Sequence, residues 1–290
     1  MSSQFKHLEV YGELPRNTHA ERRQFERVLS GINTATSNRM EFAVVAMHVN
    51  YSQPMPNRTV GAERWNGEFD LVFFGPDRIF IYELKSGPTR VVYGRTDDKH
   101  WKVKRGGKVR TERSWFDQAS KQRTFLLQTF LNQARKNLQL PEPNHFVVDA
   151  RVVCGNGSSF SGFYHKVPQT VSPEEYELLY SQAPPDDKEF LESVFTRTLE
   201  ETGEYWLGPQ RNTPMWKRLE RIWNGARMNK KTERWFGLLE EREVAEDLAA
   251  TSTTKFSLSY KDACLLAERL FEATKVTNGL KPARTQALRY

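Results

Sequence analysis

The stretch that most constrains the fold is residues 65–87, which read WNGEFDLVFFGPDRIFIYELKSG. Residues 69–74 and 79–85 are rich in β-branched and aromatic side chains, which favour strands. The Gly-Pro-Asp sequence at 75–77 between them favours a turn. The stretch is therefore predicted to form an antiparallel β-hairpin.

The register of this hairpin follows from its turn. If Phe74 pairs with Ile79, then Asp70 lies opposite Glu83, because antiparallel partners keep a constant sum of residue numbers. Side chains alternate along a strand, so Lys85 lies on the same face as Glu83. The hairpin is thus expected to bring two carboxylates and one amine together at one end of two otherwise apolar strands.

Two acids and an amine at the end of an apolar hairpin are costly to remove from water unless they bind something. Hard divalent cations such as Mg²⁺ or Mn²⁺ take carboxylate oxygens and backbone carbonyls, which Asp70, Glu83 and the carbonyl of Leu84 could supply. Lys85 would then position an attacking water or neutralise charge on a phosphate. The alternative is a surface hairpin with an exposed Glu83–Lys85 pair, which would contribute little energetically.

Two segments of the hairpin, NGEFD at 66–70 and ELKSG at 83–87, resemble the core motif of the nuclease-related domain (NERD) family. This family belongs to the PD-(D/E)xK nuclease superfamily. The similarity extends over about residues 15–155 and includes Trp101 in a later predicted hairpin. The resemblance implies a restriction-endonuclease-like αβββαβ core within an α/β fold, a divalent metal ion, and hydrolysis of phosphodiester bonds.

The candidate site has two further members outside the hairpin. Glu21 opens a predicted helix, and the resemblance implies a role in metal binding, because the matching helix acid of the superfamily often assists there. The alternative role of Glu21 is that of a capping-box residue only. Gln118 lies in the first turn of another predicted helix, where an amide can donate to a phosphate or to a metal-bound water. The alternative for Gln118 is an exposed polar residue.

Other periodic segments surround the hairpin. Residues 18–31 are predicted to form an amphipathic helix. The nearly continuous apolar run 41–49 indicates a strand covered on both faces, with His48 near its end as a structural histidine. A helix capped by Ser114 or Asp117 and a last strand over 145–154 complete an α/β domain.

Positive charge is concentrated next to the proposed site. Residues 85–136 contain 14 Lys or Arg against 4 Asp or Glu, within a chain of net charge +7. Such a block is the electrostatic footprint expected for a phosphate backbone, although a solvated charged face would have the same composition. The residues expected to contact nucleic acid, DNA rather than RNA, are Lys102, Lys104, Arg105, Lys108, Arg110, Arg113 and Lys121.

Composition narrows the class of protein. Of the 290 residues, 38% are hydrophobic, which is enough for a substantial core, and no apolar run approaches membrane-spanning length. The N-terminal residues lack a signal-peptide pattern, so we expect a cytoplasmic protein with no membrane partner. Cys154 and Cys264 have no second Cys or His at metal-ligand spacing, so we expect free thiols rather than a zinc site or a disulfide.

The sequence changes character after residue 168. Residues 1–168 are predicted to form the nuclease-like domain, and residues 169–290 a mostly helical accessory region. Its expected helices start near 172 and cover about 187–201, 214–227, 231–250 and 259–274. The basic, Trp-rich residues 215–236 could contact DNA or a protein partner such as a helicase, although aromatic residues at helical spacing more often pack in a core. Formation of a homo-oligomer stays open.

Together these patterns predict a nuclease that hydrolyses phosphodiester bonds with the help of Mg²⁺ or Mn²⁺. The competing interpretation is a catalytically silent module with a nuclease-like fold, which binds nucleic acid or recruits a partner protein. The chain has no Gly-rich phosphate loop that ends in Gly-Lys-Ser or Gly-Lys-Thr, so any use of ATP would require a separate partner.

Overall fold

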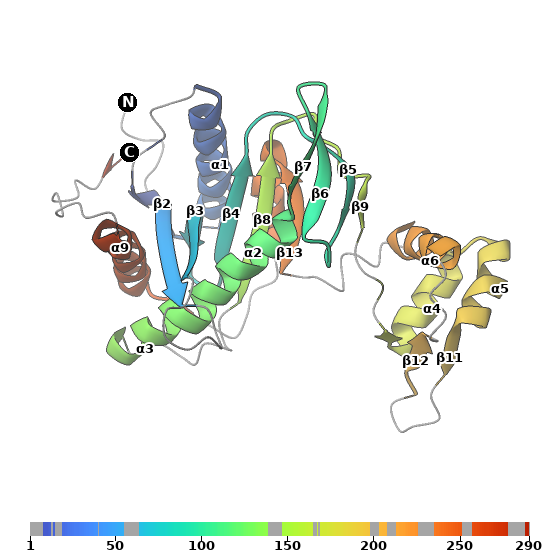
Figure 1. Ribbon diagram of the computed structural model, residues 1–290. Coiled ribbons are helices and arrows are strands. Elements are labelled where there is room, and N and C mark those ends of the chain that lie inside the picture. The colour runs from blue at the N-terminus through green and yellow to red at the C-terminus, as the bar shows by residue number, and fades with distance from the viewer. Residues whose placement is uncertain are drawn as a thin grey trace.

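The computed structural model describes residues 8–12, 14, 19–39, 41–54, 64–138, 147–164, 167, 169–197, 203–207, 213–225, 235–250, 257–277 and 288–289. Its centre is a seven-stranded mixed sheet in the order β13-β8-β4-β3-β2-β1-β14 (Figure 1). The strands are β1 (Leu8–Tyr11), β2 (Ala43–Pro54), β3 (Arg64–Phe74), β4 (Ile79–Lys85), β8 (Val148–Cys154), β13 (Phe236–Glu240) and β14 (Leu288–Arg289). In chain order, α1 (His19–Asn38), β2, β3, β4, α2 (Trp115–Thr124) and β8 confirm the predicted αβββαβ arrangement.

The predicted hairpin is present in its predicted register. β3 and β4 pair antiparallel with Phe74 opposite Ile79. The regular pairing recorded between these two strands ends one position before Asp70 and Glu83. β4 pairs on its other side with β8, in parallel, as far as its last residue, Lys85. The two candidate acids therefore lie where β3 and β4 stop being paired.

Helices cover both faces of the central sheet. On one face, α1 packs with α8 (Val244–Ala250) and with the short 3₁₀ helix η3 (Glu241–Glu243). On the other face lie α2, the π-helix η1 (Phe125–Leu131), α3 (Asn132–Leu138) and α9 (Tyr260–Thr277) (Figure 1). Each face has its own cluster of buried apolar side chains, so the strands are apolar on both sides, as the sequence of the hairpin and of β2 predicted.

α1 is longer than predicted. It ends at Asn38 rather than near residue 31, because Ala35 and Thr36 are also buried and continue its packed face by another turn. Thr18, the first residue of the predicted helix, lies outside the described residues. Of the two candidate caps of α2, Ser114 is the one observed, since its side chain accepts a hydrogen bond from the N–H of Asp117 at 3.2 Å.

The alternation of side chains inverts at one level of the sheet. In β3, Phe69 and Val72 both lie in the apolar core beneath α2, whereas Leu71 lies in the core beneath α1. The inversion falls at Asp70, and the register places it opposite His48 of β2, which has a positive φ of 50°. Positive φ is uncommon outside glycine and costs about 1–3 kcal/mol. Because of the inversion, the carboxylate of Asp70 does not enter the apolar core and instead reaches the main chain of β4.

A second sheet is formed by three strands that lie in the chain between β4 and α2, together with one short strand that follows β8. Its order is β7-β6-β5-β9, and its strands are β5 (Arg90–Arg95), β6 (His100–Arg105), β7 (Lys108–Arg113) and β9 (Phe163–Tyr164). The inner face of this sheet buries Trp101 completely, with its ring centroid 5.3 Å from that of Trp115 on α2. Gly94 permits this contact, because a Cβ there would lie 2.6 Å from the indole. The second sheet is thus fastened to the helix that covers the candidate site.

Residues 170–225 contain a smaller unit with its own core. It consists of β10 (Thr170–Val171), α4 (Pro173–Gln182), α5 (Pro185–Val194), β11 (Phe195–Arg197), β12 (Tyr205–Leu207) and α6 (Thr213–Gly225) (Figure 1). α4 begins near the predicted start at residue 172, with a capping box between Ser172 and Glu175. Trp223 of α6 is fully buried in this core, which favours packing over binding as its role. An ion pair between Arg95 and Glu220, at 2.7 Å, links the unit to the second sheet.

The C-terminal region is mostly helical, as predicted, but one of its predicted helices is not continuous. The predicted helix over 231–250 is interrupted by β13, which pairs in parallel with β8 and is followed by η3 and α8; residues 231–234 lie outside the described part. Periodicity alone cannot tell whether a short apolar run forms a buried strand or part of a buried helix. Here the edge of β8 stabilises the strand. α9 packs against β2. Residues 170–225 are therefore inserted in a main domain that the later elements complete.

Two buried arginines connect these late elements to the sheet. Arg151 of β8 donates to Asp247 of α8 at 2.8 Å, and Arg78 in the hairpin turn donates to the carbonyl of Leu248 at 2.7 Å. Both arginines are less than a tenth exposed, and Arg78 also pairs with Asp77. Such charges are costly to bury without partners, so α8 is an integral layer of the main domain.

The composition of the helices and the state of the two cysteines can be compared with the sequence analysis. Within the described ranges, no helix combines the length and the apolar composition needed to cross a bilayer. Cys154 and Cys264 are free thiols, as predicted. Burial raises the pKa of Cys154 to about 12, which is the behaviour of an inert structural cysteine.

Candidate functional site

The candidate site lies at the carboxyl end of β4, where β3 and β4 part. Three charged side chains are close together there: Asp70 of β3, and Glu83 and Lys85 of β4. Lys85 contacts Glu83 directly, and the charges of both residues act on Asp70. The carboxyl ends of strands in open α/β sheets are the usual place for a ligand. The three side chains at the end of the predicted hairpin thus form one polar cluster.

Asp70 is held by the main chain of β4. Its Oδ2 accepts the N–H of Leu84 at 2.6 Å. The N–H and C=O of one residue in an extended strand point to the same edge, so the Leu84 carbonyl lies on the Asp70 side of β4. Burial and the negative charge of Glu83 raise the pKa of Asp70 well above its usual range, while the Leu84 N–H and Lys85 oppose that shift. A cation at this position would relieve the repulsion between the two carboxylates.

Glu83 is only 4% exposed and accepts three hydrogen bonds. Its Oε1 accepts from Lys85 Nζ at 2.6 Å and from Gln118 Nε2 at 2.5 Å, and its Oε2 accepts from Gln122 Nε2 at 2.7 Å. A carboxylate offers about four lone-pair positions, so one position on Oε2 stays available to a further ligand. The amine and the two amides hold the orientation of Glu83.

α2 provides the two glutamines from one helical face. Gln118 and Gln122 are four residues apart, which places them on the same side of the helix. Gln122 is 1% exposed and also donates to the carbonyl of Glu68 at 2.7 Å, so it joins β3 to the Glu83 carboxylate. Gln122 is absent from the predicted site residues, although its spacing from Gln118 is a signal for it.

The oxygen donors of the cluster suit a hard divalent cation. The carboxylates of Asp70 and Glu83 and the carbonyl of Leu84 are the ligand types that Mg²⁺ or Mn²⁺ takes, with waters completing the octahedron. Within the described part of the chain, no three His, Cys, Asp or Glu side chains are grouped closely enough to hold a metal by themselves. A cation that keeps several waters, such as Mg²⁺, fits this set better than a structural Zn²⁺, which takes four protein ligands.

Glu21 belongs to α1, which covers the face of the sheet opposite α2. It lies in the first turn of α1, and its charge acts on His48 of β2. His48 Nδ1 is 3.2 Å from Glu68 Oε1, and this hydrogen bond raises the pKa of His48 although burial opposes the shift. The charge of Asp70 acts on His48 as well. His48 therefore connects the side of the site that carries Glu21 with the side that carries Asp70.

Gln24, one turn further along α1, holds the ends of two strands. Its Nε2 donates to the carbonyl of Lys85 at 3.2 Å and to the carbonyl of Val153 at 3.0 Å. These carbonyls belong to the last residues of the β4–β8 ladder. Gln24 is 3% exposed, so it fixes the backbone of Lys85 from inside the protein, and sequence patterns that seek charged residues do not detect it.

The residues predicted to contact nucleic acid divide into two groups. Those exposed on β6 and β7 are Lys102, Lys104, Lys108 and Arg110. Those with partners inside the protein are Arg105, which lies 3.3 Å from Glu112, and Arg113 and Lys121, which both lie 2.9 Å from Asp117. The first group is the part of the basic block that is most accessible to a ligand.

Replacing Gln122 by methionine is expected to weaken Mn²⁺ binding about 10–100-fold, because the side chains that orient a metal-binding carboxylate have effects of this size. The side chain keeps a similar volume but no longer donates to Glu83 and to the Glu68 carbonyl. Isothermal titration with MnCl₂ measures the effect. Gln128→Met, on the exposed side of η1, is the matched control. Equal Mn²⁺ affinity in both variants would contradict the role assigned to Gln122.

Residues 44–153 match the family model of the nuclease-related domain, NERD. Comparison of the chain with curated proteins and with solved structures finds no match. The matched segment begins in β2 and ends in β8, and it contains the β3–β4 hairpin, the β5–β7 strands and α2. It therefore holds every member of the polar cluster around Glu83. The segment that builds the candidate site is thus similar in sequence to the nuclease-related domain family.

Proposed function

We propose that the protein is a metal-dependent nuclease that hydrolyses phosphodiester bonds in DNA rather than RNA, acting in the cytoplasm. The observation that carries this proposal is the convergence of Asp70, Glu83 and Lys85 at the end of the hairpin, under a helix that supplies two amides to Glu83. The family of residues 44–153 supports the same chemistry.

Asp70, Glu83 and the carbonyl of Leu84 would hold Mg²⁺ or Mn²⁺. Such an ion lowers the pKa of a water molecule and stabilises charge on the leaving oxygen of an in-line displacement. Asp70 must give up its proton to act as a ligand, and its raised pKa makes this step sensitive to pH. Glu83 arrives at the site already oriented by Gln118 and Gln122.

Lys85 would position the attacking water and compensate the charge that builds on the phosphate. Its ammonium group is 2.6 Å from Glu83 and 3.4 Å from the side-chain oxygen of Gln118, so two acceptors hold it in the cluster. Gln118, near the start of α2, would donate to a phosphate oxygen or to a water molecule, and the helix N-terminus favours an anion there. Glu21 would support the site through His48.

A catalytically silent module is the second candidate, and one observation favours it. Lys85, Gln118 and Gln122 already satisfy most of the hydrogen-bonding capacity of Glu83 without a metal ion. A fold of this kind could bind nucleic acid with its exposed basic residues and not cut it. Only a measurement of turnover separates the two candidates.

Incubation of the full chain with supercoiled plasmid, linear duplex, single-stranded DNA and RNA tests the proposal. We expect cleavage of DNA with MgCl₂ or MnCl₂ and none with EDTA, because the reaction requires the ion for its nucleophile. Adding excess Mg²⁺ after EDTA should restore cleavage. If the chain binds DNA in a salt-dependent manner but cuts none of these substrates, the silent module replaces the nuclease.

A further inference from the structure

The outer face of the second sheet carries cations on neighbouring strands. The register of β5, β6 and β7 aligns Arg90 with Lys104, and Lys104 with Val109. The burial of Trp101 and Val103 places the alternate residues of β6, including Lys102 and Lys104, on the exposed face. Like charges directly opposite each other on paired strands destabilise a sheet. An anion bound between Arg90 and Lys104 would remove that repulsion.

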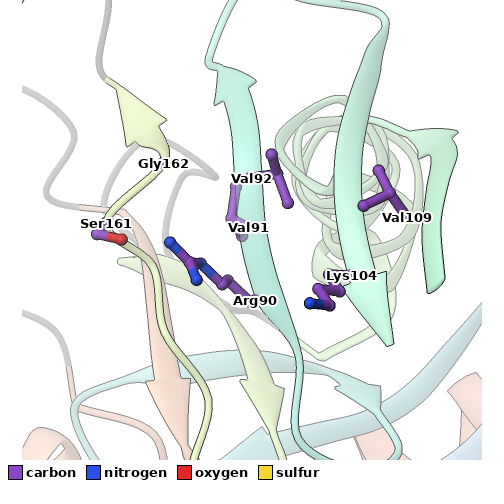
Figure 2. A pocket seen from close by; sticks show the side chains of 7 residues that line it. All are labelled: Arg90, Val91, Val92, Lys104, Val109, Ser161 and Gly162. Carbon is purple, nitrogen blue, oxygen red and sulfur yellow. The ribbon is translucent and has the colours of Figure 1, made fainter. Parts of the chain in front are cut away.

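A depression of about 410 Å³ lies at this pair of cations. Besides Arg90 and Lys104, it is lined by Ser161 and by the exposed side chains of Val92 and Val109, which are 42% and 57% accessible (Figure 2). In Figure 2 the guanidinium group of Arg90 reaches toward the segment that carries Ser161, while Val92 lies on the same strand as Arg90 and Val109 lies on β7. The depression therefore combines two cations and a hydroxyl with small apolar surfaces, which suits a phosphate attached to a sugar or base.

The depression is connected to the candidate active site by two short segments. One runs from Lys85 to Arg90, and five residues of extended chain span at most about 18 Å. The other follows β8, where Gly155 donates to the carbonyl of Gly87 at 3.1 Å, and it leads to Ser159 beside β5. A strand of duplex DNA advances about 3.4 Å per nucleotide, so this reach corresponds to about five nucleotides.

We propose that the depression lined by Arg90, Lys104 and Ser161 binds a backbone phosphate of the nucleic-acid substrate, within about five nucleotides of the scissile bond. Val92 and Val109 then contact the adjacent sugar or base. This inference rests on the proposed function, because it assigns a second contact to the same substrate. It extends the substrate path across the second sheet, beyond the metal site.

The full chain with Asp70→Asn is used to measure nucleic-acid binding, because this substitution is expected to prevent cleavage. Fluorescence anisotropy follows labelled single-stranded and duplex oligonucleotides over a range of NaCl concentrations. Arg90→Gln combined with Lys104→Gln should weaken binding at least about tenfold at low salt, and should make the slope of log K against log [NaCl] shallower by about two. Lys188→Gln combined with Lys261→Gln removes the same charge from α5 and α9, and should leave the slope unchanged.

The outcomes separate this inference from the nuclease proposal. Equal affinity and slope in the two double variants would overturn the phosphate site, while metal-dependent cleavage by the native chain would still support the nuclease. If the Asp70→Asn chain binds no oligonucleotide but binds vesicles of anionic phospholipid through Arg90 and Lys104, the depression is a lipid site and the inference fails. The melting temperature of each variant, read by circular dichroism, shows whether it is folded.

Discussion

Asparagine at position 70 is expected to reduce DNA cleavage by at least about a thousandfold and, without metal, to raise the melting temperature. A metal ion stabilises the charge of the transition state by several kcal/mol, and each 1.36 kcal/mol is a factor of ten in rate, which gives about this loss when the ion no longer binds. Asparagine keeps an oxygen for the N–H of Leu84, so the Asp70→Asn chain should fold.

The expected stabilisation follows from the raised pKa of Asp70. A carboxyl group with a raised pKa in the folded state stabilises the fold while protonated, and that contribution is lost as the pH rises from its unfolded pKa through its folded pKa. At neutral pH and above, Asp70 therefore lowers the stability of the metal-free protein, whereas neutral asparagine does not. Below pH 4 the difference between the two proteins should disappear.

Thermal melts at several pH values, with EDTA or with MnCl₂, check this prediction beside the plasmid assay. Mn²⁺ should raise the melting temperature of the native protein and leave that of Asp70→Asn unchanged. Asp98→Asn, at an acid in the turn between β5 and β6 whose pKa is also raised by burial, is the control and should keep metal-dependent cleavage. A variant at Asp70 that cuts DNA at the native rate would exclude this residue from the metal site.

Replacing Lys85 by methionine is expected to lower cleavage about 10²–10³-fold while metal binding survives, since a group that stabilises charge developing in the transition state contributes on this scale. Lys85 competes with a cation for Oε1 of Glu83, from which its Nζ is 2.6 Å away. Its removal frees a position on this carboxylate. Mn²⁺ affinity should therefore stay equal or increase, although the rate falls.

Single-turnover cleavage and a Mn²⁺ titration of the melting temperature test this separation of rate from affinity. Lys261→Met is the control, because Lys261 is an exposed residue of α9 with no role in the site, and its loss should leave the rate unchanged. If Lys85→Met loses Mn²⁺ binding together with activity, Lys85 serves to hold Glu83 in place and has no separate chemical role.

The hairpin could be predicted from the sequence because its information is local. The Gly-Pro-Asp turn determines that Phe74 pairs with Ile79, and period-two alternation then sets the pairing and the facing of the other residues of the hairpin. The same local logic predicted the helix start at Ser114 and the start of a helix near residue 172. Each of these features depends on residues within a few positions of one another.

Features that depend on distant partners could not be predicted in the same way. Phe236–Glu240 is a strand because it pairs with the edge of β8. The residues next to it in the sequence carry no signal for this pairing. The inversion of alternation at Asp70 requires the matching irregularity at His48 on another strand. Simple alternation places Asp70 beside Glu83, but it does not predict the hydrogen bond from the Leu84 N–H that holds it.

The site residues show the same division. Charged side chains at the ends of apolar strands can be recognised as candidate site residues from the sequence, as Asp70, Glu83 and Lys85 were. Gln122 and Gln24 are neutral, buried and far in sequence from the groups they hold, so their roles depend on how α2 and α1 pack against the sheet. Neutral amides are inexpensive to bury beside a carboxylate, because they donate hydrogen bonds without adding charge.

The late position of β13 in the chain has a consequence for synthesis. Between Cys154 and Phe236 lie about 80 residues, which a ribosome adds in about 4–16 s at 5–20 residues per second. During that interval the outer edge of β8 has no strand beside it, and all seven residues of β8 are ones that the finished protein buries. A bare, apolar strand edge can pair with another chain. Each newly made molecule therefore passes through a period in which it can aggregate, and this period ends only when residues 236–240 leave the ribosome and close the sheet.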